Sequence, residues 1–215
     1  MIIIKNNDEI ALMKKAGRIV GETLLLLEKE VKPGITTADL DRIAEEFITK
    51  HGAKPSFKGL YGFPSSLCIS VNEQVIHGFP GKYVLKEGDI VSVDCGAFLD
   101  GFHGDAARTF PVGNISVEAQ SLIDITKESF FQGIKFAKKG NKLTDISHEI
   151  QSYVEAAGFS VVRDFVGHGI GRKVHEDPNV PNFGKSGKGP KLLEGMVLAI
   201  EPMVNMGAYK VKTLK

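Results

Sequence analysis

The apolar positions of the chain repeat with a helical period in four stretches and with a shorter, strand-like period between them. Positions 10, 13, 20, 24 and 27 form one apolar stripe, which predicts a long helix capped by Asn7 or Asp8 and ending at Pro33-Gly34. Further helices are predicted over 37–51, 116–139 and 143–157, and early strands near 68–71 and 75–77. The Gly-, Lys- and Pro-rich segment 180–191 is expected to be a loop, because it lacks the strand and helix that a phosphate loop needs.

A β-hairpin is the clearest local prediction. Residues 90–98 are rich in β-branched and apolar side chains, Asp100-Gly101 favours a two-residue type I′ turn, and residues 102–110 return as a second strand. Pairing Leu99 with Phe102 places Asp105 opposite Gly96 and diagonal to Asp94 on one face. The hairpin therefore predicts two carboxylates on the same face of a sheet.

Two such carboxylates lie roughly 5 to 8 Å apart at Cβ. Among Val, Ile, Ala and Phe they repel each other and lose solvation unless a proton or a cation lies between them. A pair of divalent metal ions is the simplest hypothesis, since carboxylates bridge hard cations well. The hairpin alone leaves open the plainer interpretation, in which its aspartates are scattered and solvated.

The chain contains an internal duplication that favours the metal hypothesis. VLKEGDIVSVDCG aligns with KLLEGMVLAIEPM at an offset of 107, which matches Gly88 to Gly195 and Asp94 to Glu201. Upstream, residues 34–52 resemble residues 140–158 at an offset of 106, and HGFP and HEDP form a weaker third match. We therefore expect two related α/β halves, about 1–112 and 113–215, whose strands meet around one pseudo-symmetric site. The halves are expected to form a single catalytic domain, 1–215.

Three histidines complete the candidate site. His168 is flanked by glycines, which let the backbone pack closely and the imidazole project, and it is predicted to be a metal ligand. His77 and His175 are each expected at a strand end before a turn, where a general acid or base could reach a substrate. A buried structural histidine and surface loop histidines are the competing interpretations. No role is assigned to the other three, His51, His103 and His148.

Composition narrows the class of protein. The chain has 215 residues, 42% of them hydrophobic, enough for one substantial core. Its 27 basic and 26 acidic residues give no electrostatic reason to bind nucleic acid or a membrane. The opening apolar run is too short for a signal sequence, and two cysteines, Cys68 and Cys95, indicate no disulfide framework. We expect a cytoplasmic enzyme that is a monomer.

At this point the motifs match a known family. The chain resembles a type I methionine aminopeptidase from about residue 3 to residue 215, through SLCISVNEQVIHGFP, VSVDCGAFLDGFHGDAARTF, VGHGIGRKVHEDP and EGMVLAIEPM. The resemblance implies the duplicated α+β fold called pita-bread, with a central curved antiparallel sheet flanked by helices. It also implies hydrolysis of the first peptide bond, which removes the N-terminal methionine from nascent proteins and peptides.

The resemblance further implies roles for particular residues. Two divalent ions, Co, Mn, Fe or Zn, would be held by Asp94, Asp105, His168 and Glu201. Glu201 would manage the proton of the attacking water, His175 would stabilise the carbonyl oxygen, and His77 would bind the peptide near the scissile nitrogen. The methionine side chain would occupy a small apolar pocket lined by Phe63, Cys68 and Val174, although Cys68 could equally be plain core.

The chain departs from the family pattern after Glu201. The family has a fifth ligand, a second glutamate on a last hairpin strand, but none of residues 202–215 is acidic. The chain as given therefore lacks this ligand, which is expected to weaken both metal positions. Two other functions stay open: a proline-specific aminopeptidase or prolidase of the same fold, and a non-catalytic peptide-binding protein on this scaffold.

Overall fold

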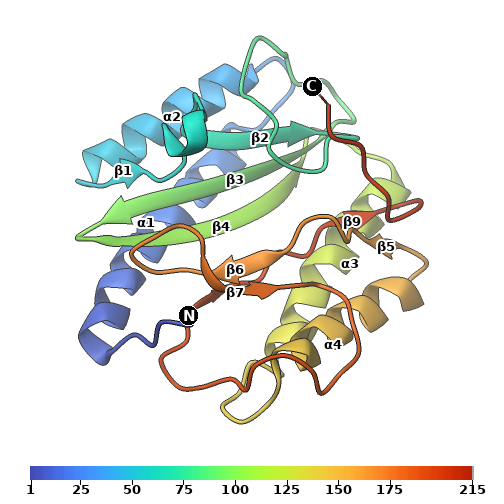
Figure 1. Cartoon of the computed structure of the whole chain (residues 1–215). Helices are drawn as coiled ribbons and strands as arrows, with labels where there is room; N and C mark the ends of the chain where they lie inside the picture. The colour runs from blue at the N-terminus through green and yellow to red at the C-terminus, as the bar shows by residue number, and fades with distance from the viewer. Residues whose placement is uncertain (215) are drawn as a thin grey trace. The chain divides into compact units, whose positions relative to one another are not determined.

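The fold mixes helices and antiparallel strands, as the α+β prediction requires (Figure 1). The computed structural model describes residues 1–214. Its helices are α1 (Asn7–Glu30), α2 (Thr37–Lys50), α3 (Val117–Ile134) and α4 (Leu143–Ala156), with a short 3₁₀ turn, η1 (Leu60–Gly62). Its strands are β1 (Lys54–Pro55), β2 (Leu67–Val71), β3 (Ile90–Leu99), β4 (Phe102–Pro111), β5 (Ser160–Val161), β6 (Gly167–Gly169), β7 (Glu176–Val180), β8 (Leu198–Ala199) and β9 (Val204–Asn205).

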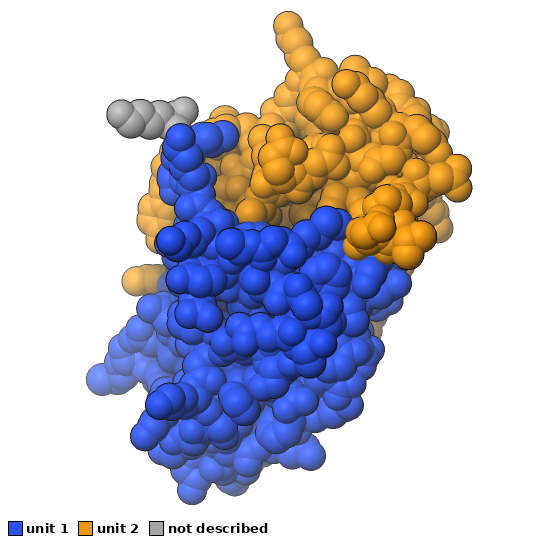
Figure 2. Space-filling view, turned by 90° about the vertical axis from the view of Figure 1, so that its right-hand side faces the viewer, with its two compact units in different colours: residues 1–5, 120–170, 175–215 blue, residues 6–119, 171–174 orange. Residues whose placement is uncertain are grey.

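The chain divides into two compact units, which Figure 2 distinguishes by colour. Unit 1 contains residues 1–5, 120–170 and 175–215, and unit 2 contains residues 6–119 and 171–174. The first five residues thus belong to the unit that holds the C-terminal half of the sequence. The expectation of one catalytic domain with halves at about 1–112 and 113–215 stays a prediction.

Unit 2 is built on the predicted hairpin. Strands β1 and β2 pair with β3, β4 pairs with β3 as well, and every pairing is antiparallel. The register is the predicted one, with Leu99 opposite Phe102 and Gly96 opposite Asp105. Asp100 and Gly101 have φ of 51° and 86°, as a type I′ turn requires. The local turn chemistry therefore fixes which face the two aspartates share.

Helix α1 packs across β3 and β4 of this sheet, and α2 packs beside β1 and β2 (Figure 1). The predicted stripe of α1 faces the core, where Val20, Leu24 and Leu27 are fully buried. The cap is Asn6, so the prediction of Asn7 or Asp8 was wrong by one or two residues. The Asn6 side chain accepts a hydrogen bond from the Glu9 N–H, and the Glu9 side chain accepts one from the Asn6 N–H. This reciprocal pair is a capping box, which Asn7 and Asp8 cannot form.

Unit 1 has a small sheet in the order β7-β6-β8, in which both pairings are antiparallel, and a two-stranded ladder of β5 and β9. Helices α3 and α4 touch at Gly133, where an added Cβ would lie 2.6 Å from a side-chain carbon of Ile150. Its apolar core contains Leu143, Ile146, Ile150, Val180 and Leu192. This core holds α4 against the strand that carries the residues after His175.

The two units repeat the same local backbone conformations. Helices α2 and α4 start 106 residues apart and each has 14 residues. The glycines that precede them, Gly34 and Gly140, have φ of 96° and 101°, and Gly88 and Gly195 have φ of 91° and 88°. Conformations with positive φ strain any residue with a Cβ, so glycine recurs wherever the repeat needs them. The aligned sequence segments therefore adopt matching structures in the two units.

One predicted strand and two predicted helix ends were wrong. No strand forms over 75–77, which is irregular, although Gly78 exchanges backbone contacts with β2. Helix α3 ends at Ile134 instead of Lys139, and α1 ends at Glu30, before the Pro33-Gly34 turn. The predicted loop 180–191 is irregular apart from its first residue and one isolated bridge at Lys191. The errors fall at element ends, where hydrophobic periodicity carries least information.

Asp89 stabilises the start of β3 in a way that depends on pH. Its carboxylate accepts hydrogen bonds from Asn72 Nδ2 at 2.8 Å, the Lys86 N–H at 2.9 Å and the Tyr83 hydroxyl at 3.0 Å. Burial, the largest single influence, raises the pKa of Asp89, but the hydrogen bonds together outweigh it and hold the pKa below its usual value. The bonded carboxylate contributes stability above the unfolded-state pKa of about 3.9, and that stability is lost as pH falls through the lower folded value.

We expect Asp89→Asn to lower the free energy of unfolding at pH 7 by about 1 to 3 kcal/mol, because the amide cannot accept all three bonds. The difference from the parent protein should shrink as pH falls below about 4, where the parent carboxylate becomes protonated. Urea unfolding at pH 7 and pH 3 measures this, with Asp164→Asn, an exposed aspartate, as the control. A loss of equal size at both pH values would contradict the assigned role.

Candidate metal centre

Unit 2 holds two of the predicted ligands, Asp94 and Asp105, on one face of its sheet. Asp94 pairs with Ala107 and with Cys68, and Asp105 pairs with Gly96. Both aspartates are half-buried. Because cross-strand partners share a face, Cys68 lies on the face of Asp94, beside the carboxylates. The predicted geometry of the two aspartates is therefore confirmed.

An apolar cluster adjoins these carboxylates. Phe57, Cys68 and Val174 are buried together, and Leu60 and Phe63 pack against them. A Cβ at Gly96 would lie 2.9 Å from a ring carbon of Phe57, so glycine opposite Asp105 leaves room for that ring. The structure thus brings together the three predicted pocket residues, and it adds Phe57 and Leu60, which no sequence signal singled out.

The thiol of Cys68 is a neutral part of this cluster. Burial above all, with the negative charges of Asp94 and Asp105, raises the pKa of the Cys68 thiol far above its usual range. A protonated thiol behaves as a small apolar group. Cys68 therefore suits the wall of an apolar pocket and not the role of a nucleophile.

His77 lies in unit 2 on irregular backbone after β2. It has φ of 57°, a conformation that costs free energy for a residue with a Cβ and that is concentrated at functional sites. Gly78 holds it there: the Gly78 carbonyl accepts from the Ile69 N–H at 2.9 Å, and a Cβ at Gly78 would lie 2.1 Å from the Ile69 oxygen. The prediction that His77 ends a strand was wrong, because only Gly78 reaches β2.

Unit 1 holds the other two predicted ligands, His168 and Glu201. His168 is buried in the middle of β6, the central strand of its sheet. Both flanking glycines are required: a Cβ at Gly167 would lie 2.2 Å from the Ala199 oxygen, and one at Gly169 would lie 2.1 Å from the Asp177 oxygen. Close packing of β7 and β8 against β6 therefore explains the Gly-His-Gly pattern.

The His168 ring is oriented by a backbone hydrogen bond. Nδ1 lies 2.9 Å from the Gly169 carbonyl oxygen, which can only accept, so the ring donates from Nδ1. In a neutral imidazole the lone pair is then on Nε2, the arrangement found in metal-binding histidines. The His175 ring packs against His168 with its centroid 4.5 Å away and at 78°, edge to face. His175 lies immediately before β7, so the predicted strand end was wrong here too.

Glu201 faces Nε2 of His168. Its Oε1 atom lies 3.1 Å from His168 Nε2, yet this buried oxygen accepts no hydrogen bond from any residue among 1–214. Two ligands of one cation, each about 2.1 Å from it, lie about 3 Å apart with their lone pairs aimed at the ion. A buried carboxylate oxygen without a donor is costly unless a cation satisfies it. The pair therefore fits a bound divalent metal ion.

The Glu201 backbone is held separately from its side chain. Asn182 is fully buried, and its Nδ2 donates to the Glu201 carbonyl oxygen at 2.7 Å. Glu201 follows β8 by two residues, whereas its counterpart Asp94 lies inside the ten-residue β3. The duplicated carboxylates therefore occupy equivalent positions in the alignment, but only Asp94 lies within a regular strand.

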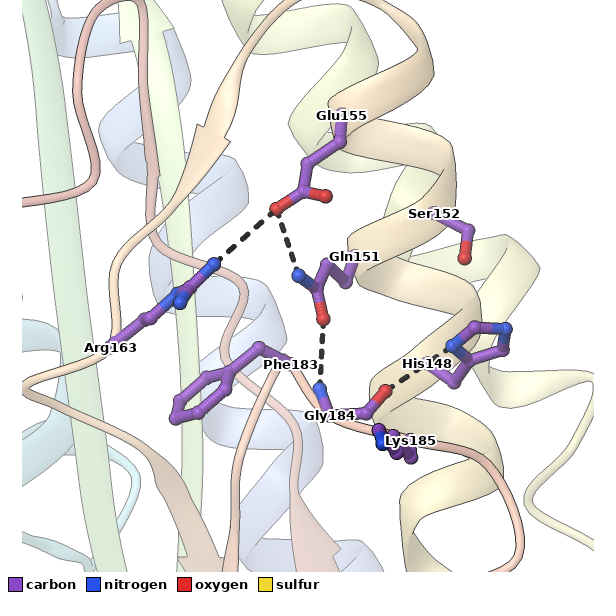
Figure 3. A pocket seen from close by; sticks show the side chains of 8 residues that line it. All are labelled: His148, Gln151, Ser152, Glu155, Arg163, Phe183, Gly184 and Lys185. Atoms are coloured by element: carbon purple, nitrogen blue, oxygen red, sulfur yellow. Dashed lines mark hydrogen bonds and ion pairs between the residues drawn. The ribbon is translucent and has the colours of Figure 1, made fainter.

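A surface pocket elsewhere in unit 1 is lined by α4 and by the loop after β7 (Figure 3). Arg163 lies 3.8 Å from Glu155, and Gln151 donates to Glu155 at 2.8 Å and accepts from the Gly184 N–H at 2.8 Å. These contacts tie the loop to the helix. None of the predicted site residues lines this pocket, so we assign it no part in the chemistry.

Comparisons with known proteins identify the family of this chain. The model of metallopeptidase family M24 matches residues 11–213, and the chain belongs to that family. It is 77% identical over 214 residues to the methionine aminopeptidase of Clostridium perfringens, covering 100% of this chain and 86% of that protein. It is 57% identical to methionine aminopeptidase 1 of Bacillus subtilis, again covering 100% and 86%.

Solved structures show the same fold. The crystal structure of methionine aminopeptidase from Thermotoga maritima superposes with a TM-score of 0.98 at 48% identity, covering 100% of this chain and 87% of that one. Prolidase from Pyrococcus furiosus gives 0.80 at 25% identity, covering 93% of this chain and 57% of that one. The chain therefore has the pita-bread fold, and its similarity to methionine aminopeptidases is far greater than its similarity to prolidases.

Proposed function

We propose that this protein is a methionine aminopeptidase, a metal-dependent hydrolase that removes the N-terminal methionine of nascent proteins and peptides. The observation that carries the proposal is the His168–Glu201 pair, in which an oriented imidazole and a carboxylate oxygen without a donor face each other at 3.1 Å. Identities of 57% and 77% to methionine aminopeptidases support the choice of substrate. The substrates are the N-termini of nascent chains, and the enzyme acts as a cytoplasmic monomer.

Four side chains would hold the proposed metal ions. Asp94, Asp105, His168 and Glu201 would bind two divalent ions, Co, Mn, Fe or Zn. Asp105, His168 and Glu201 each offer one ligand atom of a suitable kind. Divalent ions bound by such groups supply a water molecule whose pKa is lowered toward neutrality. The family's second glutamate has no counterpart among residues 202–215, which contain no acidic side chain.

The other side chains would bind and orient the peptide. Glu201 would take the proton of the attacking water, His175 would donate to the carbonyl oxygen as it gains charge, and His77 would bind near the scissile nitrogen. Phe63, Cys68 and Val174 would receive the methionine side chain, whose burial contributes roughly 2 to 3 kcal/mol. This preference for an apolar side chain separates methionine from alanine at the first position.

The experiment is the release of methionine from Met-Ala-Ser by the 215-residue chain, first stripped of metal and then given Co(II), Mn(II) or Fe(II). We expect turnover only with added metal. Faster cleavage of X-Pro peptides than of Met-Ala-Ser would replace the proposal by a proline-specific peptidase of the same fold. Tight binding of Met-Ala-Ser without turnover under any metal would indicate a non-catalytic peptide-binding protein.

None of the helices among the described residues is long and apolar enough to cross a membrane. The longest, α1, has a polar face along its whole length and buries only one side. The proposed cytoplasmic location follows from the composition and from the family resemblance, and the monomeric state is part of the same proposal.

A further inference from the structure

Lys5, near the start of the chain, forms a buried ion pair with Glu176. Lys5 Nζ donates to Glu176 Oε2 at 2.5 Å, and the two side chains are each only 3% exposed. The same ammonium donates to the Ile3 carbonyl oxygen at 3.2 Å. The partners are 171 residues apart in sequence, and both belong to unit 1. Burial of two charges is unusual enough to need a reason.

The backbone of Lys5 is fixed to a second segment of unit 1. Its N–H donates to the Gly195 carbonyl oxygen at 2.8 Å. A Cβ at Gly195, which has φ of 88°, would lie 2.5 Å from the Lys5 oxygen, so the two backbones are in close contact. Gly195 lies in the turn that precedes β8, and Glu176 is the first residue of β7. Lys5 therefore joins the segments at the two outer strands of the sheet whose central strand carries His168.

Stability alone does not account for this pair. The desolvation of two buried charges offsets most of their attraction, and well-packed apolar side chains of similar volume often serve equally well. A buried charge pair does hold both groups in one geometry, because separating the partners would leave a buried charge without compensation, at a high cost in free energy. Glu176 directly follows His175, whose ring packs on His168 at 4.5 Å. A side chain that anchors Glu176 thus also restricts where His175 can lie.

We propose that Lys5 is a positioning residue for the active site: its ion pair with Glu176 and its backbone bond to Gly195 hold His175 against the ligand His168. This inference rests on the proposed function, in which His175 meets the carbonyl oxygen of the substrate. A displacement of about 1 Å at such a group costs roughly 10²-fold in rate, even when the altered residue does not touch the substrate. Lys5 acts through Glu176 and makes no contact with the reacting atoms.

The test compares Lys5→Met with Lys139→Met. Lys139 pairs with Glu194 at 3.3 Å, but both side chains are more than 70% exposed, so this change removes an ion pair that does not hold the site. At a temperature where each variant is fully folded, we expect Lys5→Met to lower kcat for Met-Ala-Ser about 10²-fold and to change KM less than about threefold. Lys139→Met should leave both constants unchanged.

A double variant separates positioning from stability. Lys5→Met removes the ammonium group that pairs with the buried Glu176 carboxylate and should lower the melting temperature by roughly 10 °C. Adding Glu176→Gln removes the buried carboxylate charge and should recover most of the melting temperature, while kcat stays low because Lys5 no longer anchors the side chain at position 176. Recovery of kcat together with stability would overturn the proposal. If Lys5→Met does not fold, Lys5→Arg replaces it: the charge is kept, the geometry of the buried contact changes, and the same fall in kcat is expected.

A measurement without turnover makes the inference independent of the assay. In metal-free protein, the ring-proton NMR signals of His175 are sensitive to the neighbouring His168 ring, so they should move in Lys5→Met and stay in place in Lys139→Met. Unchanged His175 signals together with unchanged kcat would overturn the proposal. If the parent protein releases no methionine, the proposed function fails, but the His175 signals still decide whether Lys5 positions that ring.

Discussion

Replacing His168 by alanine is expected to lower kcat/KM for Met-Ala-Ser by about 10³-fold or more at a fixed concentration of added metal. His168 Nε2 faces Glu201 Oε1 at 3.1 Å, and its Nδ1 is held by the Gly169 carbonyl. Loss of a group that only orients a metal ligand costs 10- to 100-fold, so loss of the ligand itself should cost more. Isothermal titration of the metal-free protein with Mn(II) should show weakened binding in the same variant.

His148→Ala is the matched control for this prediction. His148 is an exposed histidine of α4 in the same unit, and its Nδ1 lies 3.2 Å from the Gly184 oxygen. Its replacement should change neither kcat/KM nor the affinity for Mn(II). If His168→Ala keeps its metal affinity and loses only thermal stability, His168 would be a structural core residue, and the proposed metal site would lose a ligand.

Gly104→Ala is expected to lower the free energy of unfolding by about 3 kcal/mol or more. A Cβ at Gly104 would lie 2.6 Å from the Gly17 nitrogen and 2.8 Å from the Ala16 carbonyl carbon, both backbone atoms of α1. Backbone atoms cannot turn aside as a flexible side chain can, so α1 must shift away from β4 along their shared contact. Overpacking that moves backbone lies at the upper end of the usual penalties. Urea unfolding of the metal-free protein measures the effect.

Gly21→Ala, in the helix that Gly104 contacts, is expected to change the free energy of unfolding in the opposite direction. Gly21 lies inside α1, has no atom within 4 Å of an added Cβ and has no positive φ. Alanine there should raise the free energy of unfolding by about 0.5 to 1 kcal/mol, because it restricts the unfolded chain at no steric cost. Equal losses in the two variants would show that the close approach of α1 to β4 is not what requires glycine at residue 104.

The hairpin could be predicted residue by residue because its determinants are local. Asp100-Gly101 sets a two-residue turn, and strict alternation then assigns Asp94 and Asp105 to one face. Predictions at element ends were less successful. The helix α1 cap is decided by reciprocal bonds between Asn6 and Glu9, a spacing that is visible in the sequence and was overlooked. The strand predicted over 75–77 does not form, because Gly78 makes the backbone contact with β2 instead. Hydrophobic periodicity does not show which residue makes such a contact.

The site residues could be named from motifs, but their physical states could not. Nothing in the sequence around His168 indicates that Nδ1 is bonded to the Gly169 carbonyl or that Glu201 Oε1 has no donor. Both depend on χ angles and on the bulge between β6 and β7 at His168 and Gly169. Phe57 was missed for a similar reason, since its place beside Cys68 follows from the missing side chain at Gly96.

The contact between Lys5 and Gly195 has a consequence for the order in which the molecule is completed. A chain is synthesised from its N-terminus at roughly 5 to 20 residues per second, so about 190 residues and roughly 10 to 40 s separate the appearance of these partners. The helices α1 and α2 and the hairpin have all been made by then. Lys5 can form this bond only after Gly195 has left the ribosome, so the docking of the first five residues follows the synthesis of α1, α2 and the hairpin.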